Sequence, residues 1–334
     1  MLHVGMDVHW KTTTICILDD HGRKVKHKRI DGYWKEVLQF VATIKKPFQV
    51  AFEASCGYGF LYDGLSKVAD RVQVAHPGHL RLIFRCKRKN DRVDATKLAK
   101  LLYLDEVPPA YVPAAGVRRW RELIEYRQSL VQRVVRCKNA LRALLRSLGI
   151  VAPKGLWSRE GRQWLKGLEL TAIHELRRDL LADELELLDG QLGRVTKVLD
   201  GMGKKSPAVM VLQSIPGVGP RTAEAMAAYI ADERRFSNTR AIGAYLGLVP
   251  CQDASAGSNR LGHITKQGPA TARKLLVEAS WQVIRRCPRT RARFERLCHG
   301  RKERRKIAVV AVARHLACCM VSMLKTGEAW RKSA

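Results

Sequence analysis

The stretch Asn90-Asp91-Arg92-Val93-Asp94-Ala95 places two carboxylates at the start of a segment with helical apolar spacing. Residues three positions apart share one face of a helix, so Asp91 and Asp94 should project together in a helix that runs to about Tyr103. The preceding residues are basic: Arg85, Lys87, Arg88 and Lys89. The acidic pair is therefore either a solvated patch beside a basic run or part of a divalent-metal site, because Mg²⁺ prefers carboxylate and phosphate oxygens.

The residues before this stretch predict a mixed sheet with helices against it. Three strands are expected within residues 2–30, where apolar and β-branched residues alternate around the turn at Asp19–Gly22. Apolar spacing and turn residues then predict a helix from Trp34 to a stop at Pro47, a strand Gln49–Glu53, a helix after the turn Ser55–Gly59, and a strand Val72–Ala75. The order β-β-β-α-β-α-β-α is typical of an α/β domain.

Two further acids stand directly after apolar strand residues. Asp7 lies in the first strand, and Glu53 ends a later one. Asp7 could be a turn-side residue and Glu53 a charge near a helix, yet an acid within an apolar strand is uncommon unless it is paired or metal-bound. Since the strands of one sheet can bring their ends together, we expect one cluster of four acids: Asp7, Glu53, Asp91 and Asp94.

Charge and length restrict the class of partner. The 334 residues suffice for two or three domains, and 61 Lys+Arg against 31 Asp+Glu give a formal net charge of +30. We expect a polyanion, and nucleic acid rather than a membrane, because no segment reads as apolar for the length of a span. The start Met1–Asp7 reaches a charge at once, which argues against a signal peptide. Nine cysteines without a Cys-x-x-Cys pair indicate reduced thiols in a cytosol.

Two long helices are predicted in the middle of the chain, at Val117–Leu148 and at about Ala172–Leu199. Leucines and other apolar residues recur at heptad spacing in both, which indicates either a helical hairpin within one chain or a coiled coil between subunits. Arginines cover the other faces of the first helix, where they are either solvated or follow phosphates. Gly201–Pro207 reads as a linker after the second helix.

Two later stretches are candidates for nucleic-acid contact. Leu212–Ala223 resembles a helix-hairpin-helix, in which Gly217, Gly219 and the neighbouring Arg221 would meet a phosphate at a helix N-terminus. A tight turn without a ligand is the alternative. Cys251–Ile264 is rich in small residues, and composition favours a passive surface loop over a loop that substrate approaches. Basic residues follow in and after it: Arg260, His263, Lys266 and Arg273.

Three motifs together resemble the acidic DEDD set of the IS110 family of transposases. They are Gly5-Met6-Asp7-Val8, Phe52–Gly59 and Asn90–Ala95. The family consists of insertion-sequence recombinases with an RNase H-like domain similar to RuvC resolvases, and the resemblance covers nearly the whole chain. It implies that Asp7, Glu53, Asp91 and Asp94 are metal ligands. Together they would hold a pair of Mg²⁺ ions, which clamp the phosphodiester between them.

The resemblance also implies a nucleophile. Ser255 aligns with the family's nucleophilic serine, and Lys266-Gln267-Gly268 and Arg273 match the residues that follow it. This chain reads Ser255-Ala256-Gly257 where the family has a Ser-Gly pair, so Ser258 is the alternative.

The resemblance predicts an α/β plus α organisation: an RNase H/RuvC-like domain at 1–115, a coiled-coil region at 116–205, and a mainly helical transposase domain with a helix-hairpin-helix at 206–334. The implied protein is a cytoplasmic bacterial or archaeal DNA recombinase. Its partners would be donor and target double-stranded DNA, a structured bridge RNA, and further copies of itself, as a dimer or as a tetramer on DNA. The alternatives are a RuvC-like junction-resolving nuclease that uses water, and a non-catalytic nucleic-acid scaffold.

Overall fold

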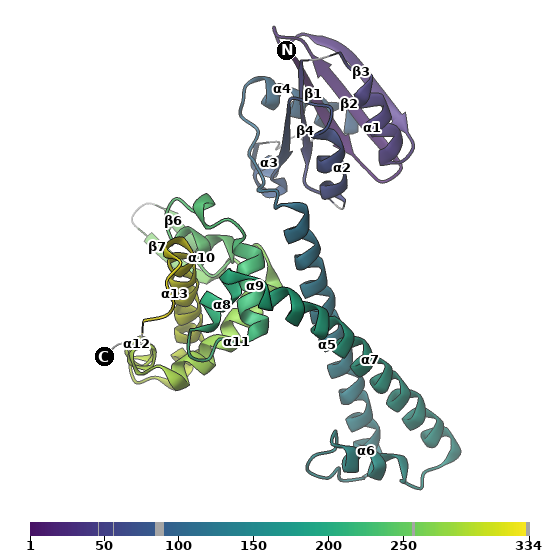
Figure 1. Cartoon of the computed structure of the whole chain (residues 1–334), viewed down its shortest axis with the longest axis vertical. Helices are drawn as coiled ribbons and strands as arrows, with labels where there is room; N and C mark the ends of the chain where they lie inside the picture. Colours follow the sequence, from purple (N-terminus) through teal and green to yellow (C-terminus); the bar gives the residue numbers. More distant parts are fainter. Residues whose placement is uncertain (46, 56, 84–89, 256–257, 332–334) are drawn as a thin grey trace. The chain divides into compact units, whose positions relative to one another are not determined.

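The computed structural model describes residues 1–45, 47–55, 57–83, 90–255 and 258–331 (Figure 1). Arg85, Lys87, Arg88 and Lys89, the basic residues noted before Asn90, lie outside this range. The chain forms two compact units, Met1–Arg118 and Arg119–Ala334. The finer division into three domains stays a prediction.

The first unit is built on a five-stranded mixed sheet, as predicted. Its strands are β1 (Leu2–Val8), β2 (Thr12–Leu18), β3 (Lys24–Asp31), β4 (Phe48–Glu53) and β5 (Arg71–Ala75). The spatial order is β3-β2-β1-β4-β5. Strands β1, β2 and β3 are antiparallel neighbours, whereas β4 is parallel to β1 and β5 is parallel to β4.

Helices cover both faces of this sheet. On one face Met6 and Phe52 are fully buried in a cluster that includes Val37 of α1 (Trp34–Ala42) and Leu61 of α2 (Tyr58–Leu65). The alternate strand residues face the other way, where α4 (Asp91–Tyr103) packs its alanines on β2 and its leucines on β4 and β5. Helix α3 (Pro77–Ile83) adds Leu80 to this second layer.

The two heptad seams pair with each other within one chain. Helices α5 (Ala115–Ser147) and α7 (Ala172–Lys204) form a hairpin, with α6 (Arg159–Lys166) near its tip (Figure 1). The shared cluster contains Leu130 and Leu141 of α5 and Leu185 and Leu188 of α7. The structure thus assigns the inner seam to the intramolecular hairpin, the first of the two alternatives.

The predicted linker after the second long helix was wrong. Helix α7 continues through Gly201 and Gly203 to Lys204, and α8 (Pro207–Gln213) begins three residues later. Gly203 is buried, and a Cβ there would lie 2.7 Å from Glu224 Oε1 of α9 (Pro220–Ile230). Gly203 therefore allows α7 and α9 to pack closely. From composition alone, the same glycine indicated a break in the helix.

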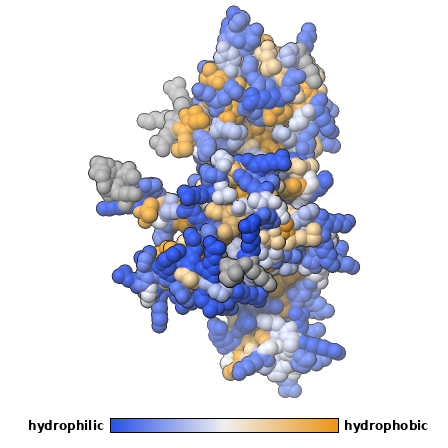
Figure 2. Space-filling model, turned by 60° about the vertical axis from the view of Figure 1, so that its left-hand side comes forward, coloured by the Kyte–Doolittle hydropathy of each residue, from blue (hydrophilic) through white to orange (hydrophobic). Residues whose placement is uncertain are grey.

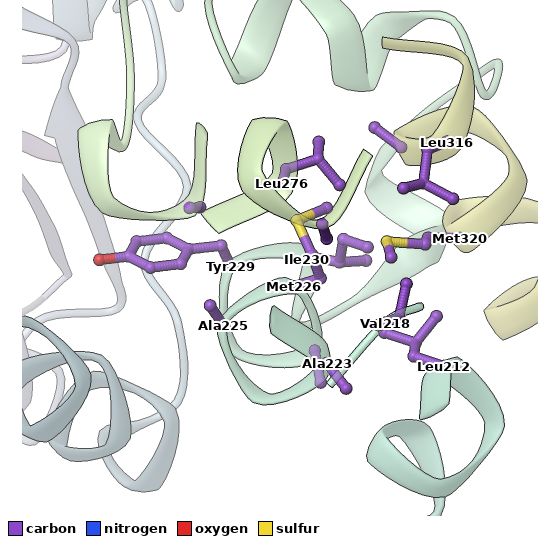
Figure 3. Packing of buried hydrophobic residues seen from close by; sticks show 14 of the residues in the cluster. Leu212, Val218, Ala223, Ala225, Met226, Tyr229, Ile230, Leu276, Leu316 and Met320 are labelled. Atoms are coloured by element: carbon purple, nitrogen blue, oxygen red, sulfur yellow. The ribbon is translucent and has the colours of Figure 1, made fainter. Parts of the chain in front are cut away.

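The rest of the second unit is mainly helical around one large core. Helix α9 is its centre, since every residue from Thr222 to Ile230 is buried. Figure 3 shows Met226 and Ile230 among side chains of α11 (Ala270–Arg286) and α13 (Arg305–Thr326). The remaining elements are α10 (Ala241–Tyr245), α12 (Pro288–Cys298), β6 (Pro250–Ser255) and β7 (Ser258–Ile264).

One helix contradicts the prediction that no segment is apolar enough to span a membrane. The segment Lys302–Thr326 is long and apolar enough to cross a membrane by length and composition alone. Half of its most apolar stretch of 18 residues is buried inside the protein. Leu316, Ala317 and Met320 of this segment lie in the core around α9. A core helix meets the same test of length and composition, so the helix is accounted for by its packing.

A buried charge cluster joins α9 to the helical hairpin. Glu224 is 1% exposed and accepts a hydrogen bond of 2.8 Å from Arg221, which also pairs with Asp200 of α7. Burial raises the pKa of Glu224 to about 7, against the opposing attraction of Arg221. Among the described residues Glu224 Oε2 finds no hydrogen-bond partner. Removing a carboxylate from water here costs more than its ion pair returns.

The cluster predicts a pH-dependent stability. The pKa of Glu224 in the folded protein is raised above its ordinary value of 4.5. The contribution of Glu224 to the free energy of unfolding is therefore fully present below pH 4.5 and is lost as pH rises through about 7. The free energy of unfolding of wild type, minus that of Glu224→Gln, should fall by about 3 kcal/mol from pH 4 to pH 8, at 1.36 kcal/mol per pKa unit. Denaturant titrations at both pH values measure it, and a difference that stays constant contradicts it.

Candidate metal centre and serine hairpin

The placement of α4 on the sheet starts with a glycine in β1. A Cβ at Gly5 would lie 2.2 Å from the backbone nitrogen of Ala99 and 2.3 Å from the carbonyl oxygen of Ala95. Only a residue without a side chain allows this backbone-to-backbone approach. Asp7 lies two residues further along the strand, on the same face as Gly5. Helix α4 therefore begins beside Asp7.

Glu53 reaches the same edge of the sheet from the neighbouring strand. In the parallel pair of β1 and β4, Met6 lies opposite Phe52, so Asp7 and Glu53 each follow a paired, fully buried residue. Both acids consequently stand on the face that α4 covers, at the carboxyl ends of adjacent parallel strands. Glu53 is partly exposed.

The first turn of α4 supplies the other two acids. Asn90 caps the helix, since its side chain accepts a hydrogen bond of 2.8 Å from the backbone nitrogen of Val93. Asp91 and Asp94 follow, where the positive end of the helix dipole favours carboxylates. Asp94 also lies 3.7 Å from Lys97 Nζ and is 22% exposed, whereas Asp91 is 53% exposed.

The structure brings a histidine into the cluster that the sequence reasoning missed. His9 Nε2 lies 3.5 Å from Asp7 Oδ2 and 3.9 Å from Asp91 Oδ1. One ligand atom from each of these three residues lies within 4.8 Å of the others. The sequence held a signal for this, because His9 stands two residues after Asp7, one residue past the end of β1, and alternate residues of a strand share a face.

The other three acids lie close enough to Asp7 to raise its pKa. Burial raises the pKa of Asp7, His9 opposes this, and the charges of Asp91, Asp94 and Glu53 raise it further. Like charges held together are unfavourable until a cation joins them. Carboxylate oxygens are the ligands that suit Mg²⁺ and Mn²⁺, whereas an imidazole nitrogen suits transition metals such as Fe²⁺ and Zn²⁺. The donor set therefore fits a divalent cation.

The stretch read from composition as a loop is a two-stranded hairpin. Strands β6 and β7 pair with Asp253 opposite Arg260 and Ser255 opposite Ser258. Ser255 is the last residue of β6 and Ser258 the first of β7. Ala256 and Gly257, which connect them, lie outside the described residues. Both candidate serines thus stand at the turn end of one hairpin.

The base of this hairpin is fixed by close backbone packing. Arg273 Nη1 donates to the carbonyls of Leu246 and Gln267, at 2.9 Å each. A Cβ at Gly268 would lie 2.0 Å from the carbonyl oxygen of Tyr245, and Gly268 has a φ of +72°. Arg273, expected at nucleic acid, thus holds the loop that ends the hairpin, while Lys266 and Arg260 are exposed.

The residues of the expected helix-hairpin-helix occupy a turn between α8 and α9. A Cβ at Gly217 would lie 2.7 Å from the backbone of Gln282, so this glycine packs against α11. Gly219 is the N-cap of α9. The guanidinium of Arg221 is engaged with Asp200 and Glu224 and its side chain is 17% exposed. Phosphate contact at these positions stays a prediction.

Two transposase domain families match this chain. Residues 4–150 match the DEDD transposase domain of IS110 elements, a span that includes all four acids. Residues 209–295 match the transposase domain of the IS116/IS110/IS902 family, a span that includes both hairpin serines.

Several transposases are similar to the chain over nearly their whole length. The probable family 20 transposase of Pseudomonas aeruginosa is 26% identical over 326 residues, which cover 93% of this chain and 92% of that protein. The transposase of insertion element IS1111A from Coxiella burnetii is 26% identical, over 99% of this chain and 92% of its own length. The transposase of IS1328 from Yersinia enterocolitica is 26% identical, over 93% and 92%.

Because the acids are crowded, we expect them to lower the stability of the metal-free protein while they favour the binding of a divalent cation. Because the folded pKa of Asp7 is raised, its ionised form weakens the metal-free fold, and this cost disappears as pH falls below the ordinary value of 3.8. Asp7→Asn should therefore raise the melting temperature of metal-free protein at pH 7, with a gain that shrinks toward pH 4.

A divalent metal ion should reverse the order of the melting temperatures of wild type and Asp7→Asn. Millimolar Mn²⁺ should raise the melting temperature of wild type more than that of Asp7→Asn, since a ligand stabilises the state that binds it. Asp20→Asn, an exposed acid at the β2–β3 turn, serves as the control and should respond to Mn²⁺ as wild type does. Equal Mn²⁺ responses of wild type and Asp7→Asn would contradict the metal centre.

Proposed function

The chain belongs to the IS110 family of insertion-sequence transposases, enzymes that cut and join DNA, and we propose that it does so through a serine nucleophile and a metal-binding acid cluster. The observation that carries the proposal is the approach of Asp7 and Asp91 to a common point, from a strand and a helix that Gly5 holds in contact. Its substrate is DNA, and the cytoplasm is its expected place.

We assign the first unit to the RNase H-like fold. The support is the order β3-β2-β1-β4-β5, with three antiparallel strands followed by two parallel ones. The acids at the ends of β1 and β4 and at the start of α4 then stand where the resemblance to RuvC resolvases expects the metal site.

The proposed ligands are Asp7, Glu53, Asp91 and Asp94, with His9 as an added nitrogen donor. A pair of Mg²⁺ ions held there would polarise the phosphodiester and neutralise charge that develops on its oxygens. The chain's own share is to fix four carboxylates on one sheet face and to place His9 beside them. Asp7 is 17% exposed, against 22% for Asp94 and 53% for Asp91, and would make the firmest ligand of the three.

The chemistry consists of two balanced transesterifications. Ser255 Oγ attacks the phosphorus, its proton passes to a carboxylate, and the bond from phosphorus to one deoxyribose oxygen breaks as that oxygen takes up a proton. A phosphoserine ester with DNA results. A hydroxyl of the second strand then attacks the same phosphorus and releases the serine, so that strands are exchanged without net loss of bonds. Ser258 is the alternative nucleophile.

The positive charge and the outer face of α7 support the proposed partners. A net charge of +30 accommodates donor DNA, target DNA and the bridge RNA that we infer selects them. Subunit association is proposed because reaction would join the acids of one subunit to the serine of another. Helix α7 carries a second apolar row at heptad-like spacing, and its members are half-exposed or more: Ile173, Leu176, Leu180 and Leu187.

Ser255→Ala tests the nucleophile. The variant should bind DNA as wild type does, because one hydroxyl adds little to an interface governed by charge. It should neither cleave nor exchange strands, whereas wild type leaves a DNA adduct that survives denaturation. Mass spectrometry maps the adduct to the peptide with Ser255, and Ser258→Ala is the matched control.

The outcomes separate the mechanisms. An adduct on Ser258 keeps serine chemistry and moves the residue. Cleavage by the Ser255→Ala, Ser258→Ala double variant, with no adduct in wild type, would instead establish attack by water and end the recombinase proposal.

Helix α7 allows the interface and the fold to be tested apart. Leu180→Asp changes the exposed row and should reduce the oligomer mass in light scattering while the helical signal stays. Leu188→Asp places a charge in the seam, where Leu188 is fully buried, and should destabilise the hairpin by several kcal/mol. An unchanged oligomer in a folded Leu180→Asp variant would exclude this row as the interface.

A further inference from the structure

A row of exposed aromatic side chains lies beside the acid cluster. The ring centroids of Tyr33 and Trp10 are 5.2 Å apart, those of Trp10 and Trp34 4.8 Å, and those of Trp34 and Phe60 6.1 Å. Trp10 is 58% exposed, Tyr33 50% and Phe60 49%. Four aromatic rings thus touch in sequence at the surface of the first unit.

Three of these rings lie outside the core of the sheet. Trp34 packs against the core of the sheet, but the core cluster leaves out Trp10, Tyr33 and Phe60. Trp10 occupies the turn between β1 and β2, where the backbone nitrogen of His9 donates to the carbonyl oxygen of Thr12 at 2.9 Å. Exposed apolar groups gathered in one place indicate a binding surface.

Local contacts hold the row in place. Trp34 Nε1 donates to the carbonyl oxygen of His9 at 3.3 Å. Gly57 lies against the ring of Trp34, since a Cβ there would fall 1.9 Å from it, and Gly57 has a φ of +75°. The backbone nitrogen of Gly32 donates to the carbonyl oxygen of Lys11 at 2.9 Å, which keeps Tyr33 beside the turn. The rings are therefore ordered before any ligand arrives.

A hollow lined by two of these rings reaches His9, the neighbour of the acids. It has a volume of about 450 Å³, and its lining includes His9, Trp10, Trp34 and Ser55. His9 also lies 3.5 Å from Asp7 in the acid cluster. A phosphate at the acids would thus have the aromatic rings as the next surface along its strand. In the view of Figure 2 the surface is mainly hydrophilic, with apolar patches scattered over it.

We propose that Trp10, Tyr33, Trp34 and Phe60 form a stacking platform for unpaired bases of the DNA strand whose phosphate meets the acid cluster. Aromatic rings bind bases through their faces, which a duplex hides between neighbouring pairs. Lys11, exposed in the same turn, can meet the backbone of that strand. The substrate strand is then unpaired beside the scissile phosphate. This inference rests on the proposed function only for the position of that phosphate.

The test separates base contacts from phosphate contacts. Fluorescence anisotropy in EDTA measures the binding of the full chain to a single-stranded DNA 12-mer, and to the same oligonucleotide with three central abasic sites. Wild type should bind the intact strand about tenfold more tightly, as expected for base–aromatic stacking. Trp10→Ala should bind both strands alike, at the level of the abasic one, and Trp10→Phe should keep most of the preference.

A matched tyrosine pair controls for general effects. Tyr33→Ala should weaken binding of the intact strand, while Tyr126→Ala, on α5 and 48% exposed, should not. Equal binding of intact and abasic strands by wild type, or an undiminished preference in Trp10→Ala, would overturn the proposal. So would a preference found with RNA 12-mers but not with DNA, or a loss of subunit association in Trp10→Ala with binding unchanged.

The measurement does not depend on the proposed chemistry. Binding in EDTA requires neither a metal ion nor Ser255, so failure of the serine adduct would leave the platform standing. Loss of the stacking preference would in turn leave the acid cluster and the serine untouched.

Discussion

The contact of Gly5 with the backbone of α4 is the constraint on which the acid cluster depends. It holds the helix so close to β1 that a single methyl group would meet backbone atoms of Ala95 and Ala99. The sheet supplies Asp7 and Glu53 through its register, and the helix supplies Asp91 and Asp94 through its first turn. Protein interiors are close-packed, so even one added methyl group at position 5 would push α4 away from β1. The glycine at this position therefore sets the positions of the acids on α4 relative to those on the sheet.

The acid cluster and the aromatic row both hold groups in places that are unfavourable for the fold without a ligand. Carboxylates at one point repel one another, and burial makes this worse for Asp7. Exposed rings of Trp10 and Tyr33 leave apolar surface in water. The sheet offsets both costs, because side chains such as Met6 and Phe52 are fully buried in its core and stabilise it. A ligand with a phosphate and unpaired bases would relieve both at once.

Much of the first unit could be predicted, because its signals are local. Alternation gave the strands, and acids after apolar residues marked Asp7 and Glu53 as exceptional. His9 was missed, although it continues the face of Asp7, because a lone histidine near a turn has no distinct pattern. Its place beside the acids is seen only in the fold, where Asp91 of α4 lies 3.9 Å from it.

The second unit shows where local signals fail. Heptads in α5 and α7 predicted a seam but not whether its partner lay in the same chain, since both arrangements bury the same residues. Gly203 was read as part of a linker because its partner, Glu224, lies far along the sequence. The hairpin of β6 and β7 lacks apolar alternation, so composition indicated a loop.

The central claim is that the acids around Asp7 hold a divalent cation. Anomalous diffraction from crystals soaked in Mn²⁺ tests it most directly, since the signal locates the metal without reference to activity. The account predicts a peak with oxygens of Asp7 and Asp91 at about 2.0–2.3 Å, the range of hard divalent cations with oxygen ligands. Well-ordered carboxylates with no peak among them at saturating Mn²⁺, or a peak only elsewhere in the chain, would contradict it.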